Sequence, residues 1–304
     1  MSDTLEKYYD SIENIDRACS TVIENSITVF LPFKRIDKTD IYKKFKKNNN
    51  VIDIENNFFK KVECKGRLLG QTHKDILEIL LSMSEHTTYS KDTARFKITT
   101  TAYELTKKLK RNRGKKQWII KKIDEIAECR IKIFYTTLNN DNETFNFNFI
   151  SSIRTINENE IEINFTPEYT YFLIHNELLD YKNYIPSIME LESDIKEIQR
   201  TYKKRRNLDG SYGLKRGINT EFIKSIVRYM LTHNGKNSQI SIDNLINKIK
   251  LNEIMSNREL EENLFDLKRE PVQELLKNKF GITLTADEQT LTFNSIHSKY
   301  HIKN

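Results

Sequence analysis

Residues 99–149 constrain the fold most, because the hydrophobic period changes within them from that of helices to that of strands. Apolar residues recur at helical spacing over 101–109 and again over 115–128. They then alternate with polar residues over 131–135 and 145–149, on either side of a polar turn. The stretch therefore predicts two short helices followed by an antiparallel hairpin.

The densest positive charge of the chain lies at the turn between these two helices. Its members are Lys107, Lys108, Lys110, Arg111, Arg113, Lys115 and Lys116. On the exposed face of the second helix, the first half carries Gln117 and Lys121, whereas the second half carries Asp124, Glu125 and Glu128. A groove lined by phosphates would accept only the first half. The pattern predicts a helix that enters the major groove of DNA by its N-terminal end.

Further patterned segments extend this unit on both sides. An apolar helix is predicted at 72–83, ahead of the basic helix pair. A third alternating strand, 161–165, is predicted to complete one small antiparallel sheet with the two strands of the hairpin. Earlier in the chain, residues 26–33 are predicted to be β-rich and residues 43–50 to be a polar, basic loop.

Several residues mark where helices begin or divide. Thr101, three residues before a glutamate, has the spacing of a capping box. Thr166 followed by Pro167 is a strong start signal, because proline suits the first helical position. Pro271 is expected to divide the helical stretch 258–279 near residue 270, because proline lacks an N–H and crowds the preceding turn.

The C-terminal third repeats the order of the middle third. A long helix at 185–206 ends in the cations Lys203, Lys204, Arg205 and Arg206. These cations could stabilise the negative end of the helix dipole or contact phosphates, and both interpretations stay open. Helices at 219–233, 241–251 and 258–279 and a hairpin at 281–293 follow. The order helix, helix, helix, hairpin predicts a second copy of the first unit.

Composition and length agree with a folded, two-domain protein. The chain has 304 residues, of which 38% are hydrophobic and 31% charged, and its formal net charge is +7. The sequence contains no apolar run long enough to span a membrane and does not begin like a signal peptide, so a cytoplasmic location is expected. Its three cysteines are odd in number and lack C-x-x-C spacing, which predicts reduced, mostly buried thiols.

Sequence motifs for catalysis are sparse. The chain has neither a phosphate-binding P-loop nor a G-x-G-x-x-G loop, so nucleotide hydrolysis is not expected. A nickase would need metal-binding histidines near a nucleophilic tyrosine, and the close pair His297 and His301 lies at the C-terminus. Glu158, Glu160 and Glu162 fit an exposed sheet face better than a catalytic cluster. No catalytic residue, metal site or cofactor is predicted.

Three segments resemble a known family. They are the helix-turn-helix with its hairpin at 99–149, FDLKREPVQELL at 265–276 leading into GITLT, and KGRLLGQTHKDILEILL at 65–81. The first two resemble plasmid replication initiator (Rep) proteins built from two winged-helix domains, and the third looks like the first-domain opening of the TrfA-like branch. The similarity covers most of residues 65–293.

The resemblance implies an α+β fold with two tandem winged-helix domains and an N-terminal helical extension. Residues 1–50 would be an N-terminal helix and arm, 51–182 the first winged-helix domain, and 183–304 the second with its connecting helix. The helix at 5–22 has an a/d seam that could form a homodimer or pack on its own domain.

The implied function is a non-enzymatic initiator. Such a protein binds repeated sites (iterons) in double-stranded DNA at a plasmid origin, helps to melt nearby DNA, and recruits the host initiator and replicative helicase. Its dimers often repress their own gene. The alternatives are a winged-helix transcriptional repressor, a nicking or priming replication enzyme, and a pure protein-interaction module.

The predicted DNA contacts form three groups. In the first unit they are Lys110, Arg111, Arg113, Lys115, Lys116, Gln117 and Lys121. At the end of the connecting helix they are Lys203, Lys204, Arg205 and Arg206, and in the second unit they are Lys268, Arg269, Gln273 and Lys277. Lysine and arginine suit phosphates and guanine, whereas glutamine suits adenine.

Overall fold

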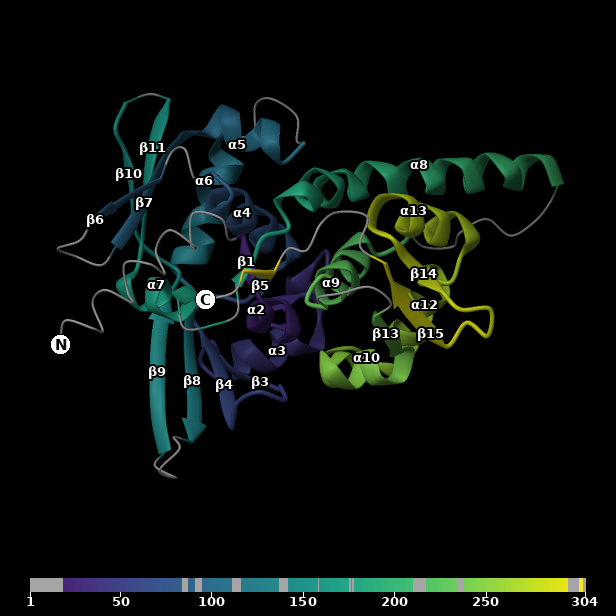
Figure 1. Ribbon diagram of the computed structural model, residues 1–304, viewed down its shortest axis with the longest axis horizontal. Coiled ribbons are helices and arrows are strands. Elements are labelled where there is room, and N and C mark those ends of the chain that lie inside the picture. Colours follow the sequence, from purple (N-terminus) through teal and green to yellow (C-terminus); the bar gives the residue numbers. More distant parts are fainter. Residues whose placement is uncertain are drawn as a thin grey trace.

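The structure is a computed structural model that describes residues 19–83, 87–90, 95–110, 116–136, 142–157, 159–174, 176, 178–209, 217–233, 238–294 and 301–302. Arg111, Arg113 and Lys115 lie outside the described residues, as does most of the predicted helix at 5–22. The chain mixes helices and strands. Its N-terminal part, up to residue 184, and its C-terminal part, from residue 185, lie side by side (Figure 1).

Two four-stranded antiparallel sheets build much of the N-terminal part. The first has the order β3 (Val51–Ile54), β4 (Lys61–Lys65), β8 (Arg130–Thr136), β9 (Asn142–Asn148). The second has the order β10 (Ile150–Thr155), β11 (Glu160–Phe165), β7 (Arg95–Thr101), β6 (Thr87–Ser90). The helices of this part are α2 (Val22–Ser26), α3 (Asp40–Lys47), α4 (Gln71–Leu81), α5 (Ala102–Lys108), α6 (Lys116–Ala127) and α7 (Pro167–Ile174).

Short strands join segments that are far apart in the sequence. β2 (Phe30–Leu31) pairs in parallel with β5 (Leu69–Gly70). β12 (Leu178–Leu179) pairs with β1 (Ser20–Thr21) on one side and with β16 (His301–Ile302) on the other. The two ends of the described chain therefore lie close together at this small sheet.

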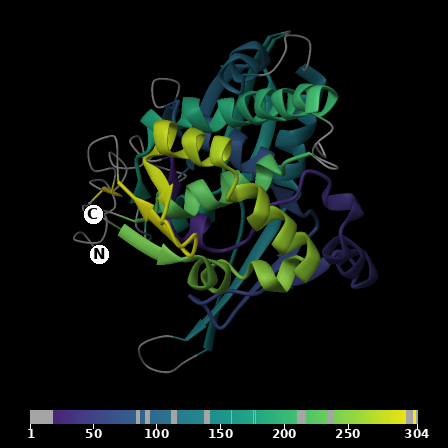
Figure 2. The same cartoon turned by 90° about the vertical axis from the view of Figure 1, so that its right-hand side faces the viewer.

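The C-terminal part begins with α8 (Ile185–Asp209), which is about 37 Å long at ~1.5 Å per residue. The helices that follow are α9 (Thr220–Met230), α10 (Ile242–Lys248), α11 (Leu251–Ile254), α12 (Asn257–Leu267) and α13 (Glu270–Phe280). The strands β13 (Ser238–Ser241), β15 (Thr290–Phe293) and β14 (Ile282–Leu284) form one sheet in that order. Figure 2 shows α8 and α13 lying next to each other above this sheet.

The predicted helix boundaries are confirmed at several points. Thr101 Oγ1 accepts a hydrogen bond from the backbone N–H of Glu104 at 3.0 Å, and Thr166 Oγ1 accepts one from Tyr169 at 3.0 Å. The long stretch 258–279 is divided, with α12 ending before the proline and α13 beginning at Glu270. The predicted hairpin at 281–293 is also present, as β14 and β15.

The predicted single sheet around the first hairpin is wrong. β11 was expected beside β8 and β9, but it pairs with β7 and β10, with Ile163 opposite Ile98. The place next to β8 is taken by β4, with Ile131 opposite Cys64. Alternation predicts that a segment is a strand, but the choice of neighbour depends on which buried faces meet in three dimensions.

The predicted basic loop at 43–50 is mostly a helix, α3. Ile41 and Phe45, four residues apart, lie on one face of this helix and are buried, and its lysines lie on the outer face. Thr39 caps it, with Oγ1 accepting from the N–H of Tyr42 at 3.3 Å. Two apolar residues were too few to reveal a helical period by sequence alone.

The two parts of the chain meet where α4 packs against α9. Lys74, Asp75 and Glu78 of α4 and Lys224 and Arg228 of α9 are each at most 2% exposed. Buried charges at this contact were not expected from the apolar appearance of residues 72–83. Each of them needs a partner nearby, because an unpaired charge in the protein interior is costly.

Arg228 is the centre of this polar contact. Its guanidinium donates to both carboxylate oxygens of Glu78 at 2.7 and 2.6 Å, to Asp75 Oδ1 at 2.7 Å and to Gln71 Oε1 at 2.5 Å. Burial alone would lower the pKa of Arg228, but Glu78 and Asp75 outweigh it and raise the pKa. Lys224 pairs with the other oxygen of Asp75. The contact thus joins the two parts through hydrogen bonds of fixed geometry.

Candidate nucleic-acid interface

The helix pair α5–α6 is anchored by apolar side chains, so its charged ends project from a rigid support. Leu105, Leu109, Ile119, Ile123 and Ile126 are each at most 3% exposed. The helices α5 and α6 also contact each other and α4. A side chain on the outer face of either helix therefore has a defined position relative to the core.

The first turns of α6 expose three of the predicted contacts. Lys116, Gln117 and Lys121 are all exposed, and residues 117 and 121 are four apart, so they lie on one face of the helix. Cationic and amide groups on one face can bind phosphates and base edges together. The predicted basic N-terminal half of this helix is therefore present on the surface.

Lysines from separate segments line a cavity of about 500 Å³ beside α5. Lys107, Lys108 and Lys110 come from the C-terminal end of α5, and Lys182 comes from the segment before α8. Of the described residues that line it, Glu104 is the one with a carboxylate. Sequence reasoning missed Lys182, since no local pattern links it to α5. Several ammonium groups around one concavity create a field that attracts polyanions.

Lys110 also connects the basic helix pair to the C-terminal part. Its Nζ lies 3.5 Å from Glu190 Oε1 on α8. The second oxygen of Glu190 lies 2.9 Å from Lys279 on α13, which is also 2.7 Å from Asp194. Lys110 is therefore partly engaged within the protein. The same chain of ion pairs holds α8 and α13 in position relative to α5.

Glu125 was predicted to be exposed on the acidic half of α6, and this prediction is wrong. The residue is 5% exposed. Its carboxylate accepts from Arg67 at 2.5 Å, from His73 Nε2 at 2.8 Å and from Lys122 at 2.6 Å. Asp124 and Glu128 are exposed, as predicted. Position 125 faces α4, and two of its partners, Arg67 and His73, are too distant in sequence for a local pattern to show them.

The protonation states around Glu125 follow from these contacts. Burial raises the pKa of Glu125, but the hydrogen bonds from His73 and Lys122 and the charge of Arg67 outweigh it and lower the pKa to about 2. Burial lowers the pKa of His73, although Glu125 opposes this effect. Since Gly70 N–H donates to Nδ1 of His73 at 2.9 Å, the ring carries its proton on Nε2 and is neutral at about pH 7.

The predicted contacts of the C-terminal part are mostly engaged within the fold. Lys268 lies 3.7 Å from Glu288, and Arg269 pairs with Asp266 at 2.9 Å and lies over the ring of Phe265. Gln273 donates to the carbonyl of Leu267 at 2.6 Å and accepts from the N–H of Leu284 at 3.0 Å. The Gln273 amide therefore joins α12 to β14 and is not directed to solvent. Lys277 is exposed.

The cluster at the end of the connecting helix lies on α8. The backbone of residues 203–206 is helical, as predicted, and their side chains lie outside what the structure describes. Figure 1 shows this end of α8 extending away from the rest of the chain. The contact of residues 203–206 with phosphate stays a prediction.

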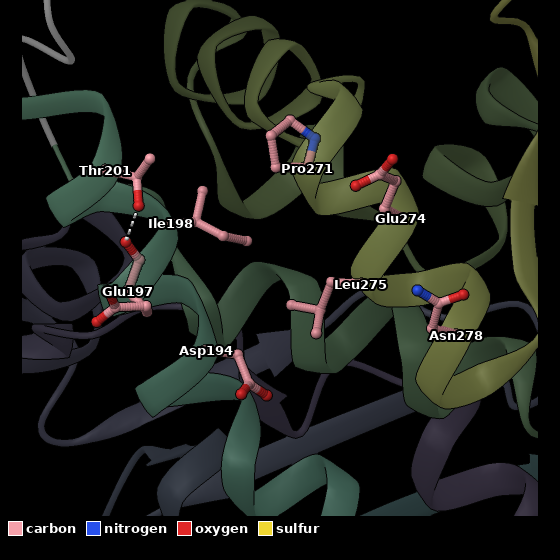
Figure 3. Close-up of a pocket in the computed structure, with 8 residues that line it drawn as sticks. All are labelled: Asp194, Glu197, Ile198, Thr201, Pro271, Glu274, Leu275 and Asn278. Carbon is pink, nitrogen blue, oxygen red and sulfur yellow. Dashed lines mark hydrogen bonds between the residues drawn. The ribbon is translucent and has the colours of Figure 1, made fainter. Parts of the chain in front are cut away.

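An acidic cavity separates α8 from α13. Its volume is about 390 Å³, and Ile198, Pro271 and Leu275 form its apolar lining. Asp194 and Glu197 from α8 and Glu274 from α13 supply carboxylates, and Figure 3 shows the two helices facing each other across it. This side of α13 would repel phosphates. Lys277 is exposed on α13 one helical turn from Glu274, so it is a cation close to this acidic surface.

Cys19, Cys64 and Cys129 are buried free thiols, as predicted, and the sulfurs of Cys64 and Cys129 lie 3.7 Å apart. Among the described residues, no group of three or more His, Cys, Asp or Glu side chains is placed to hold a metal ion. No helix in the described part of the chain is long and apolar enough to cross a membrane.

Comparison with known proteins relates the chain to others by structure alone. No family model matches it, and no curated protein sequence does. The solved structure of domain 2 and domain 3 of RctB is similar with a TM-score of 0.50 and 10% identity, covering 82% of this chain and 91% of that chain. A second structure of RctB domains 2–3 has a TM-score of 0.41 and 11% identity, covering 84% and 91%. The chain thus shares the mixed α/β fold of domains 2 and 3 of RctB.

Proposed function

We propose that this protein is a replication initiator that binds double-stranded DNA in a sequence-specific manner. The exposed basic surface formed by the ends of α5 and α6 carries the proposal, because its lysines project from a rigid helix pair. Support also comes from the fold, which is shared with two domains of the replication initiator RctB. The net charge of +7 is consistent with a polyanionic partner.

The first DNA-binding step follows from the charge distribution of α6. Lys116, Gln117 and Lys121 would enter the major groove, whereas Asp124 and Glu128 at the other end would stay away from the phosphates. Lys107, Lys108 and Lys182 would contact the backbone beside the groove. We infer that α4, α5, α6 and the hairpin β8–β9 act as one winged-helix unit within residues 51–182.

A second winged-helix unit is proposed within residues 183–304. It comprises α9, the helices α10 to α13 and the hairpin β14–β15. Its contribution to DNA binding would come from Lys277 and the cations at 203–206, because Gln273, Lys268 and Arg269 have partners within the fold. Two units of fixed separation suit repeated sites such as the iterons of a plasmid origin. Recruitment of host replication proteins and dimerisation through residues 1–50 are further parts of the proposal.

A selection experiment tests the proposed DNA binding without knowledge of the origin. Random duplex DNA would be enriched on the full-length protein, and the enriched motif would then be sought as direct repeats in the replicon that encodes it. Footprinting should show protection of those repeats. Absence of any enriched motif would rule out sequence-specific binding.

Cellular tests distinguish an initiator from the alternatives. An initiator should support replication of a plasmid that carries the repeats, whereas a repressor should bind a promoter palindrome and give no plasmid maintenance. A nicking enzyme should convert supercoiled repeat-bearing DNA to open circles in the presence of a divalent metal, and a priming enzyme should synthesise short strands. We expect replication of the repeat-bearing plasmid, without nicks or primers made by the purified protein.

A further inference from the structure

A cleft of about 530 Å³ lies between the two parts of the chain, away from the basic helix pair. Its walls come from α3 and β3 on one side and from α11 on the other. In Figure 1, α3 and β3 lie in the lower half of the molecule, whereas α5 and α6 lie in the upper half. A molecule bound in the cleft would therefore leave the proposed DNA-binding surface uncovered.

The floor of the cleft is apolar. Leu31, Ile41, Ile54 and Met255 contribute to it, and each is at most 9% exposed. Ile254 of α11 is half-buried beside them. A volume within the range of ~300–1,000 Å³ is typical of sites that enclose a small molecule or a few side chains. The cleft can thus accept apolar side chains of a short segment, but not a folded domain.

The rim of the cleft is acidic in a protein that is basic as a whole. Asp40, Asp53, Glu55 and Glu253 line it, and Lys44 is the one cation among its described lining residues. Asp40 pairs with Lys43 and Asp53 with Lys61, so the rim charge that can attract an occupant is mainly that of Glu55 and Glu253. Glu55 comes from the end of β3 and Glu253 from α11, and both are exposed. Such a rim repels phosphates and attracts ammonium and guanidinium groups. Charge complementarity therefore favours a cationic occupant over nucleic acid.

A buried hydroxyl in the wall provides an independent indication of a ligand. Thr28 lines the cleft and is 6% exposed. Its Oγ1 has no hydrogen-bond partner among the residues that the structure describes. A buried polar group without a partner is destabilising, so such groups usually have a hydrogen bond to protein, water or ligand. Because this oxygen itself is inaccessible to solvent, a small shift of the Thr28 side chain would let a polar group of the occupant supply the missing hydrogen bond.

We propose that this cleft binds a short, basic, amphipathic segment of a partner protein. Apolar side chains of the segment enter the floor formed by Leu31, Ile54 and Met255. Its lysine or arginine side chains pair with Glu55 and Glu253 at the rim, and a backbone or side-chain polar group bonds to Thr28 Oγ1. This docking does not depend on DNA binding by α6, and both partners can occupy one molecule.

Fluorescence anisotropy with a labelled model peptide tests the proposed docking. The probe is a short amphipathic peptide with leucine on one helical face and lysine on the other, titrated with the full-length protein. We expect saturable binding at one site. The double variant Glu55→Lys/Glu253→Lys should bind about tenfold more weakly, because two attractions become repulsions.

Matched controls separate the cleft from general electrostatics. The variant Glu197→Lys/Glu274→Lys carries the same charge change in the acidic α8–α13 cavity and should bind the probe as the unaltered protein does. A peptide with glutamate in place of lysine should prefer the Glu55→Lys/Glu253→Lys variant, which shows that the variant is folded. A peptide with serine in place of leucine should bind weakly.

Several results would overturn the proposal. If both double variants bind the probe peptide equally weakly, its binding reflects diffuse charge attraction. If only the control variant loses probe binding, the site is the α8–α13 cavity. Equal binding of the serine peptide would exclude the apolar floor. Failure of the glutamate peptide to prefer Glu55→Lys/Glu253→Lys, or no saturable binding, would exclude the docking itself.

Discussion

At the scale of single residues, hydrogen-bond partners decide which charged side chains are available to a ligand. Lys121 and Gln117 are exposed on the face of α6 that sequence periodicity assigned to solvent. Gln273 has the residue type expected of an adenine contact, but its amide is bonded at both ends within the fold. Glu125 looked like a solvent-facing carboxylate and is buried among three donors.

Replacing Lys121 with alanine should weaken DNA binding and its dependence on salt. If Lys121 neutralises one phosphate, the slope of log affinity against log salt should become less steep by about 0.9. Anisotropy titrations with the selected duplex at several salt concentrations measure this slope. Lys248→Ala, on the exposed C-terminal end of α10, is the matched control and should leave it unchanged. Equal effects of the two substitutions would contradict a specific role for α6.

Replacing Glu125 with glutamine should reduce stability at neutral pH. The folded-state pKa of about 2 lies below the ordinary value of 4.5, so the carboxylate stabilises the protein above about pH 4.5 and this stability is lost as the pH falls toward 2. A shift of that size would correspond to about 3 kcal/mol, which solvent screening reduces to about 1–2 kcal/mol. Urea denaturation between pH 7 and pH 3 measures it.

The lowered pKa of His73 also makes the folded protein less stable as the pH falls. The unfolded state takes up a proton more readily as the pH falls below 6.5, so acidification destabilises the fold in this window too.

Glu128→Gln, at an exposed position just after α6, is the control for Glu125→Gln. A similar loss of stability in both variants, or an unchanged pH profile for Glu125→Gln, would show that the buried ion pairs are not stabilising.

At the scale of elements, local signals determined helix ends, whereas partners determined the sheets. Thr101 and Thr166 cap helices as their positions in the sequence predicted. Gly281 ends α13 with φ +69°, a left-handed conformation that glycine adopts without steric cost. By contrast, the sequence did not predict the pairing of β11 with β7, because alternation shows that a segment is a strand but not which strand it pairs with.

Replacing Gly281 with alanine should destabilise the C-terminal part. A Cβ in the left-handed region costs roughly 1–2 kcal/mol, and this residue also directs the chain from α13 into β14. Thermal denaturation followed by circular dichroism would record a lower midpoint. Lys277→Ala, exposed on the same helix, should leave the midpoint almost unchanged. A neutral Gly281→Ala would mean that the turn relaxes to another conformation.

At the scale of the whole molecule, the contact between α4 and α9 sets the geometry between the two proposed DNA-binding units. Arg228, Asp75 and Glu78 form a buried network in which one guanidinium bonds to both carboxylates with directional geometry. The surface chain of ion pairs from Lys110 through Glu190 to Lys279 adds a second link. A fixed separation of the two units would favour repeats at a fixed spacing in the DNA.

Replacing Arg228 with leucine should destabilise the protein by about 3–5 kcal/mol, because Glu78 and Asp75 lose the buried guanidinium that pairs with both of them, while Asp75 keeps Lys224. Arg228→Lys should cause an intermediate loss of stability, since lysine keeps the positive charge but cannot form the bidentate hydrogen bonds of a guanidinium. Urea denaturation compares the variants. Arg258→Leu, at an exposed pair with Glu262, is the control and should cost less than about 1 kcal/mol. Comparable losses for Arg228→Leu and Arg258→Leu would contradict a structural role of the network.

The sequence by itself determined the local features of this protein. Hydrophobic period and capping residues predicted α4, α5, α6, the division between α12 and α13, and the hairpin β14–β15. Hydrophobic period along one helix predicted that Gln117 and Lys121 would be exposed together. These features depend on residues within a few positions of each other, and local backbone physics is sufficient to predict them.

Only the tertiary structure decided the features that join distant segments. It brought Lys182 beside Lys107, placed Glu125 among Arg67, His73 and Lys122, and paired the charges of α4 with those of α9. It also formed the acidic cleft from α3, β3 and α11. A buried charge and an exposed charge look alike in a sequence, because the free energy of burying one depends on a partner that folding brings from far along the chain.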